Sequence, residues 1–77
     1  MLTVQDVGES PLGGTRVVVR EEGGVDWTVD FQGHVAGTLT VLGMTNDGGR
    51  EGKPAATVPR ADVVAFALTA AQNAAGV

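Results

Sequence analysis

Paired carboxylates are the first feature of this 77-residue sequence that could do chemistry, because Asp26 and Asp30 fall on the same face of a predicted strand. Inverting glycosidases use two carboxylates, a general acid and a general base, about 6.5–9.5 Å apart. Four residues along a strand separate Asp26 from Asp30 by about 13 Å, which is too far. The register predicted below places an arginine opposite each aspartate, so we expect each aspartate to form a solvated ion pair with its arginine.

Ser10 and His34 are the only serine and the only histidine, so a serine–histidine–aspartate set is formally possible. The segment around Ser10 is bounded by glycine and proline and lacks the Gly-x-Ser-x-Gly turn that exposes a nucleophilic serine. His34 falls in a predicted hairpin loop, where a polar turn residue is the simpler interpretation. With one histidine and no cysteine, the chain cannot form a two- or three-histidine zinc site or a disulfide by itself. We expect no catalytic residue, no metal and no cofactor.

The segment 48–54, with the sequence GGREGKP, has some features of a phosphate-binding loop. Such a loop requires Gly, four residues, Gly-Lys and then Ser or Thr, but Asp47 stands in place of the first glycine and Pro54 follows the lysine. We interpret the longer stretch 44–56 as a flexible polar loop, since loops of this length are usually functional or disordered. Its charged residues are candidate contacts for a partner: Asp47, Arg50, Glu51 and Lys53.

A β-meander is the element pattern that the middle of the chain predicts. Residues 25–32 alternate strictly between apolar and polar side chains, which is typical of a half-buried strand. The β-branched stretch 15–21 predicts a strand before it, and the stretch 34–44 predicts one after it. Residues 2–7 predict a fourth strand at the start of the chain.

Strand register follows from keeping the apolar side chains on one face of the sheet. For the first turn, a three-residue loop at 22–24 with Gly24 in the left-handed conformation achieves this. It predicts four cross-strand pairs: Val17–Val29, Val19–Trp27, Arg16–Asp30 and Arg20–Asp26. The same rule at the second turn predicts a loop at 32–34 and four further pairs: Phe31–Val35, Val29–Gly37, Trp27–Leu39 and Val25–Val41.

The C-terminal residues 60–75 predict one helix, because they are strong helix formers without an internal Gly or Pro. Pro59 fits the first turn, Gly76 is a natural stop, and Thr57 is a candidate N-cap. Residues 1–77 are therefore expected to form one small α+β domain. Its predicted fold is a three- to four-stranded antiparallel β-meander covered on one face by a single C-terminal α-helix.

The apolar side chains of the predicted helix occupy about 200° of its circumference, which is more than one sheet face should hide. One stripe is expected to face the sheet: Val63, Phe66, Ala67, Ala70 and Ala74. The neighbouring stripe is the candidate partner interface: Val64, Leu68, Ala71 and Ala75.

Composition and charge narrow the expected partners. A net charge of −4 argues against a phosphate backbone, so we expect no nucleic acid. The first residues lack the pattern of a signal peptide and no apolar run approaches the roughly 20 residues of a membrane span, so we expect no membrane. The protein is expected in the cytoplasm or inside an assembly. A chain rich in Ala, Gly and Val but without Ile or Tyr points to GC-rich coding, as in an actinobacterium or its phage.

The function predicted from these observations is that of a non-catalytic protein–protein interaction or assembly module. A core of this size supplies about 3–5 kcal/mol of stability, and association is the remaining common way to add to it. The partner is expected to be a protein, either a second copy in a homo-oligomer or another subunit of a larger phage or bacterial assembly. The alternative is a soluble inhibitor or antitoxin-like protein whose acidic surface binds a basic protein target.

Overall fold

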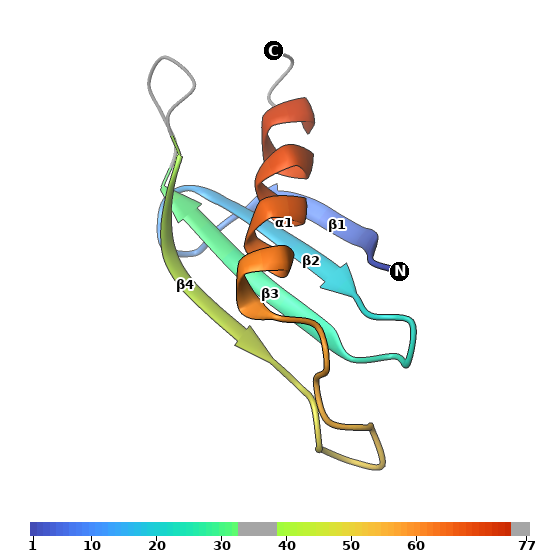
Figure 1. The fold of residues 1–77 in the computed structure, drawn as a ribbon. Coiled ribbons are helices and arrows are strands. Elements are labelled where there is room, and N and C mark those ends of the chain that lie inside the picture. Colours follow the sequence, from blue (N-terminus) through green and yellow to red (C-terminus); the bar gives the residue numbers. More distant parts are fainter. Residues whose placement is uncertain (33–38, 75–77) are drawn as a thin grey trace.

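The computed structural model describes residues 1–32 and 39–74. Four antiparallel strands form one open sheet in the order β1-β2-β3-β4, and a single helix packs on one of its faces (Figure 1). The elements are β1 (Thr3–Glu9), β2 (Thr15–Arg20), β3 (Asp26–Gln32), β4 (Thr40–Asn46) and α1 (Arg60–Ala74). The predicted α+β fold is confirmed, and so is the fourth strand at the start of the chain.

The hairpin of β2 and β3 has the predicted register. All four expected pairs are present: Val17–Val29, Val19–Trp27, Arg16–Asp30 and Arg20–Asp26. Gly24 takes a positive φ of 102°, and its amide donates to the Glu21 carbonyl oxygen at 2.9 Å. The three-residue loop therefore places the apolar side chains of both strands on one face of the hairpin and the charged side chains on the other.

The register of β4 differs from the prediction. Trp27 pairs with Asn46, Val29 with Met44, and Phe31 with Val41, so the four pairs expected at this turn are wrong. Gln32 belongs to β3 and pairs with Thr40, which excludes a three-residue loop at 32–34. His34, Val35 and Gly37 lie outside the described residues.

Two features favour the observed register of β4. Sliding β4 along β3 by an even number of residues keeps the same side chains inward. The alternation of apolar and polar residues therefore does not by itself exclude such a shifted register. A bulge at the pairs of Asp30 and Phe31 then turns Met44 toward the core, which it contacts. Beyond the strand end, the Asp47 amide donates to the Asp26 carbonyl at 3.1 Å, which extends the ladder.

The core lies between α1 and the inner face of the sheet. Its fully or nearly fully buried apolar side chains are Val17, Val19, Val25, Trp27, Val29, Phe31, Val63, Ala67 and Ala71. The helix packs mainly on β2, with further contacts to β1 and β3. In Figure 1 it crosses in front of these strands, with β4 to its left.

The helix begins three residues after its expected N-cap. The Pro59 carbonyl accepts hydrogen bonds from the amides of Asp62 (3.0 Å) and Val63 (3.2 Å), so Thr57 does not cap α1 and that prediction is wrong. The Thr57 hydroxyl instead donates to a carboxylate oxygen of Glu21 at 3.1 Å. The Thr57 hydroxyl thus binds Glu21, 36 positions away in the sequence, instead of capping the helix.

Candidate interaction surface

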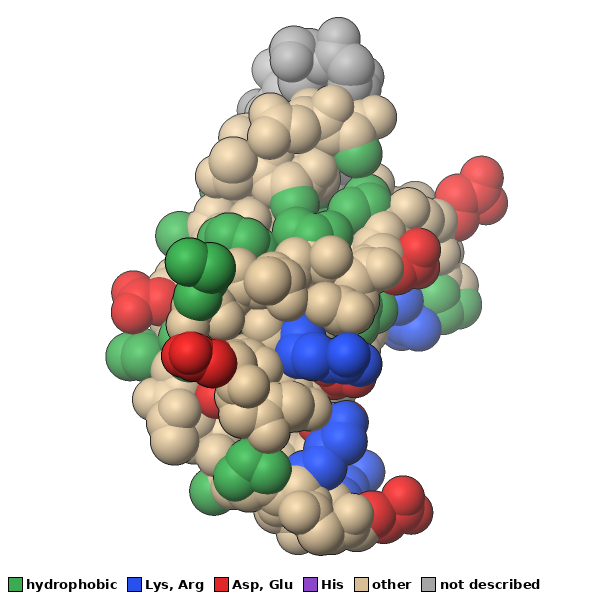
Figure 2. Space-filling model, turned by 90° about the vertical axis from the view of Figure 1, so that its right-hand side faces the viewer, with side chains coloured by type: hydrophobic (Ala, Val, Ile, Leu, Met, Phe, Trp, Pro, Cys, Tyr) green, Lys and Arg blue, Asp and Glu red, His purple; other side chains and the backbone are tan. Residues whose placement is uncertain are grey.

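The two aspartates that suggested acid–base chemistry lie on the sheet face away from α1 and are held by arginines. The Arg16 guanidinium donates to both carboxylate oxygens of Asp30 at 2.8 and 3.0 Å. That of Arg20 donates to both oxygens of Asp26 at 2.7 and 3.1 Å. These hydrogen bonds hold the pKa of both aspartates below its usual value. The predicted pairings are confirmed, but Asp30 is buried, so its pair with Arg16 is not the solvated ion pair that was predicted. Figure 2 shows blue basic side chains next to red acidic ones along one side of the molecule.

Ser10 is buried and has a structural partner. Its hydroxyl donates to Asp30 Oδ1 at 2.8 Å and accepts from the Leu12 amide at 3.0 Å. It therefore fastens the β1–β2 turn onto β3. The carboxylate that it contacts is held by Arg16, which lowers the pKa of Asp30 and makes it a poor base for activating a serine. His34 lies outside the described residues.

The expected flexible loop at 44–56 begins inside β4, because residues 44–46 are strand. The segment after it folds back on the sheet: Lys53 Nζ binds Asp47 and lies 3.7 Å from Asp26 Oδ2, and the Asp26 amide donates to Asp47 Oδ1 at 2.8 Å. Of the four candidate loop contacts, Asp47 and Lys53 thus serve the chain's own sheet, while Arg50 and Glu51 extend outward, exposed. The mobility of the segment stays a prediction.

A hollow of about 440 Å³ lies beside this turn on the outer face of the sheet. Its lining residues are Val18, Asp26, Thr28, Thr45, Asn46, Asp47 and Arg50. The carboxylates of Asp26 and Asp47 are already engaged by Arg20 and Lys53. Threonine and valine make up much of the remaining wall, so we assign no reaction to this hollow.

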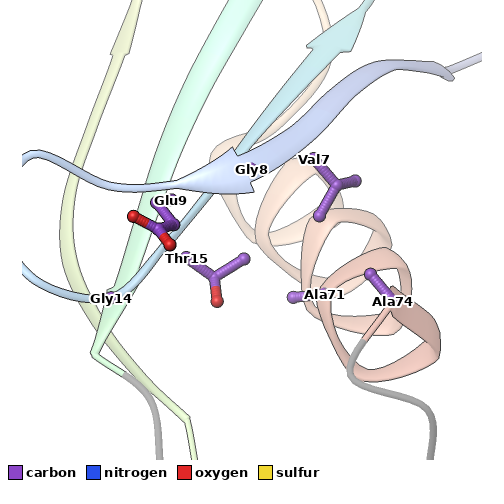
Figure 3. Close-up of a pocket in the computed structure, with 7 residues that line it drawn as sticks. All are labelled: Val7, Gly8, Glu9, Gly14, Thr15, Ala71 and Ala74. Atoms are coloured by element: carbon purple, nitrogen blue, oxygen red, sulfur yellow. The ribbon is translucent and has the colours of Figure 1, made fainter.

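A smaller hollow of about 270 Å³ lies between the C-terminal half of α1 and the β1–β2 turn (Figure 3). Val7, Gly8, Glu9, Gly14, Thr15, Ala71 and Ala74 line it. Figure 3 shows the Glu9 carboxylate and the Thr15 hydroxyl on the strand side, opposite the methyl groups of Ala71 and Ala74. One carboxylate and one hydroxyl among small residues do not form the nucleophile and base of a catalytic site.

Glu21 is a buried charged residue that the sequence interpretation missed. Its carboxylate accepts from Trp27 Nε1 at 2.6 Å, from the Thr57 amide and hydroxyl at 3.1 Å each, and from the Val58 amide at 3.4 Å. Burial by itself raises the pKa of Glu21, but these hydrogen bonds together outweigh it and leave the pKa below its usual value. Glu21 thus ties the β2–β3 hairpin to the segment that leads into α1, and no local sequence signal marks it.

The helix meets the sheet along the boundary between its two predicted apolar stripes. The buried row is Val63, Ala67 and Ala71, so Ala71 of the candidate partner interface belongs to the chain's own core. Val64 and Leu68 are half-buried and leave part of their surface to solvent. Ala75 lies outside the described residues.

Strand β4 presents apolar side chains that α1 does not cover. The cross-strand pairs place Val41 and Met44 on the inner face, where the helix packs mainly on β1, β2 and β3. Val41 is 40% exposed, and Leu42 at the bulge is 42% exposed. The sequence interpretation paired Val41 with Val25, on the sheet face that the helix was expected to cover.

The flank of α1 that carries Val64 and Leu68 faces β4. In Figure 1 the helix runs upward in front of the sheet with β4 to its left. In a right-handed helix viewed this way, a residue one position after the buried row lies about 100° further round, toward the left. Val64 and Leu68 each follow a member of that row, namely Val63 and Ala67. We call Val41, Met44, Val64 and Leu68 the β4/α1 surface.

Other classes of site find little support in the described residues. In residues 1–32 and 39–74, no group of three or more His, Asp or Glu side chains could hold a metal ion. Within the same residues, no helix is long and apolar enough to cross a membrane. Comparisons with protein-family models, with curated proteins and with solved structures each found no match to this chain.

Proposed function

We propose that this protein is a non-catalytic interaction module that associates with another protein chain through the β4/α1 surface. One observation carries the proposal: the C-terminal helix packs mainly on β2 and leaves Val41 on the inner face of β4 40% exposed, next to the helix flank that carries the half-buried Val64 and Leu68. Apolar side chains that are grouped on one face, rather than scattered singly, are typical of an interaction site.

The energetics favour covering this surface. Fully burying a Val, Leu or Met side chain gains about 1.5–3 kcal/mol, so the half-exposed members of the surface each retain roughly 1 kcal/mol that association can recover. For a domain whose own core supplies about 3–5 kcal/mol, several such gains are a large addition. Association is therefore expected to stabilise the fold as well as to connect it to a partner.

The polar side chains that could do chemistry support a non-catalytic function. Asp26, Asp30 and Asp47 are each bound to an Arg or Lys side chain, and Ser10 is buried against Asp30. The same pairing weakens the alternative of an acidic binder of a basic target, because these carboxylates are already neutralised. We therefore favour the apolar surface over the acidic one as the contact site.

Two matched pairs of variants test the proposal by light scattering coupled to size-exclusion chromatography. Leu68→Glu and Val41→Glu each place a carboxylate in the proposed contact, and both are expected to abolish association because burying an unpaired charge is costly. Their controls, Thr69→Glu on α1 and Gln5→Glu on β1, change exposed residues outside the surface and outside β4, and they are expected to behave as wild type. Circular dichroism confirms that each variant is folded.

The outcomes separate the alternatives. A wild-type assembly that both surface variants dissociate and both controls preserve supports the proposal. An assembly that is indifferent to Leu68→Glu and Val41→Glu contradicts it. A monomer that binds a basic protein in a salt-dependent manner would favour the inhibitor-like alternative instead.

A further inference from the structure

The two edges of the sheet differ in charge. β1 and β4 are the outer strands, so within residues 1–32 and 39–74 each has one side without a neighbouring strand. β1 carries Asp6 and Glu9, whose charges discourage pairing with another strand. Both edge strands have one register irregularity, between Val4 and Asp6 in β1 and at Leu42 in β4, so charge is the feature that distinguishes them. β4, with the sequence TVLGMTN, carries no charged residue. Its free edge therefore lacks the charges by which proteins usually prevent strand pairing.

Backbone groups on this edge point away from the sheet. The Asp47 amide donates to the Asp26 carbonyl, so the backbone of Asp47 faces β3. Backbone groups alternate in direction along a strand, which turns the N–H and C=O groups of Met44 and Asn46 toward the free edge. A strand from another chain could accept and donate hydrogen bonds at these two residues.

We propose that the partner is a second copy of this chain, whose β4 pairs antiparallel with β4 about a two-fold axis. This inference rests on the proposed function and specifies its partner. The pairing joins the two four-stranded sheets into one, and it brings the two β4/α1 surfaces side by side in an isologous contact.

Charge opposes a contact between two copies at β1 but allows one at β4. Each chain carries a net charge of −4, so two copies repel wherever their acidic residues meet. Pairing through β1 would bring Asp6 and Glu9 of both copies together. Pairing through β4 opposes only uncharged side chains, whereas a basic partner would gain no electrostatic attraction at this edge.

Single-cysteine variants test the two-fold pairing directly, because the chain has no cysteine of its own. Cysteine is placed in turn at each position from 41 to 45, and at Val4 on β1 as the control. Antiparallel pairing holds facing Cα atoms about 4.5–5.5 Å apart, which is within disulfide range, but only near the two-fold axis does a residue face its own copy. We expect one position of β4, with its neighbours, to form intermolecular disulfides at least about tenfold faster than Val4→Cys.

The scan also separates this inference from the proposed function. Each reduced variant is first checked for wild-type sedimentation, and the exposed positions Leu42 and Thr45 provide substitutions that least disturb the fold. If wild type associates and Leu68→Glu dissociates it, yet no β4 position cross-links faster than Val4→Cys, the two-fold β4 pairing is wrong and the interaction surface stands. If wild type is a monomer at all concentrations tested, the pairing of two copies is wrong.

Discussion

Replacing Glu21 with glutamine is expected to destabilise the fold strongly, although it exchanges only one heavy atom and removes no apolar contact. Glu21 is 4% exposed, and its carboxylate serves four donors: Trp27 Nε1, the Thr57 amide and hydroxyl, and the Val58 amide. An amide side chain has one oxygen, so the glutamine would leave at least one of these donors facing its NH₂ group. We expect a loss of about 1.5–3 kcal/mol, the typical value for a hydrogen bond to a charged group.

Urea unfolding followed by tryptophan fluorescence measures this loss, because Trp27 is the only tryptophan and its indole touches Glu21. With an m-value of about 1 kcal/mol per M for so small a domain, the midpoint should fall by about 2 M. The control is Glu22→Gln at the neighbouring exposed glutamate, which should leave the midpoint unchanged. All variants are compared at one protein concentration, since association shifts apparent stability.

The pH dependence of stability gives a second readout for Glu21. Its pKa is lowered in the folded state, so the unfolded chain binds the proton more tightly. The stability that ionised Glu21 contributes is therefore fully present above its unfolded pKa of about 4.3, and it is lost as pH falls through the folded pKa. Wild type should lose stability more steeply below about pH 5 than Glu21→Gln. Equal midpoints for the two proteins at neutral pH, with equal acid slopes, would refute this role for Glu21.

Three further predictions concern the rest of the fold. Gly14→Ala should prevent or severely weaken folding, because its Cβ would lie 1.8 Å from the Phe31 carbonyl oxygen, and a thermal melt like that of wild type would contradict this. Ser10→Ala should cost about 1–3 kcal/mol in urea unfolding through the lost hydrogen bond to Asp30, and an unchanged midpoint would argue against it. In amide exchange, the Gly49 amide should be protected relative to the unfolded chain, since it donates to a carbonyl across its turn at 2.9 Å. Exchange of Gly49 at the unfolded rate would instead support the mobile loop expected from the sequence.

Much of the fold follows from short-range pattern, as the β2–β3 hairpin illustrates. A three-residue turn places Val19 opposite Trp27 and Arg20 opposite Asp26. The alternation of apolar and polar residues, together with Gly24 in the turn, therefore predicts the register. The position of β4 did not follow in the same way. An even slide keeps the same faces inward, and the bulge that brings Met44 to the core has no distinct sequence signal.

Long-range contacts explain what else the sequence left undetermined. Thr57 has a side chain suited to an N-cap, but its hydroxyl donates a hydrogen bond to Glu21, which directly follows β2. The helical periodicity predicted the apolar arc of α1 correctly, yet it could not show that Ala71 lies in the buried row while Leu68 lies on the flank. The choice depends on how the helix rotates on the sheet, which the packing of both elements decides.

Residue-resolved amide exchange at two protein concentrations is the most direct test of the central claim, that the β4 side of the molecule is an interface. If two copies meet there, the outward amides of Met44 and Asn46 should exchange more slowly as the concentration rises through the association range. The amide of Val4 on β1 should show no such change. Exchange rates at Met44 and Asn46 that are independent of concentration, in a protein shown by sedimentation to associate over the same range, would contradict the account.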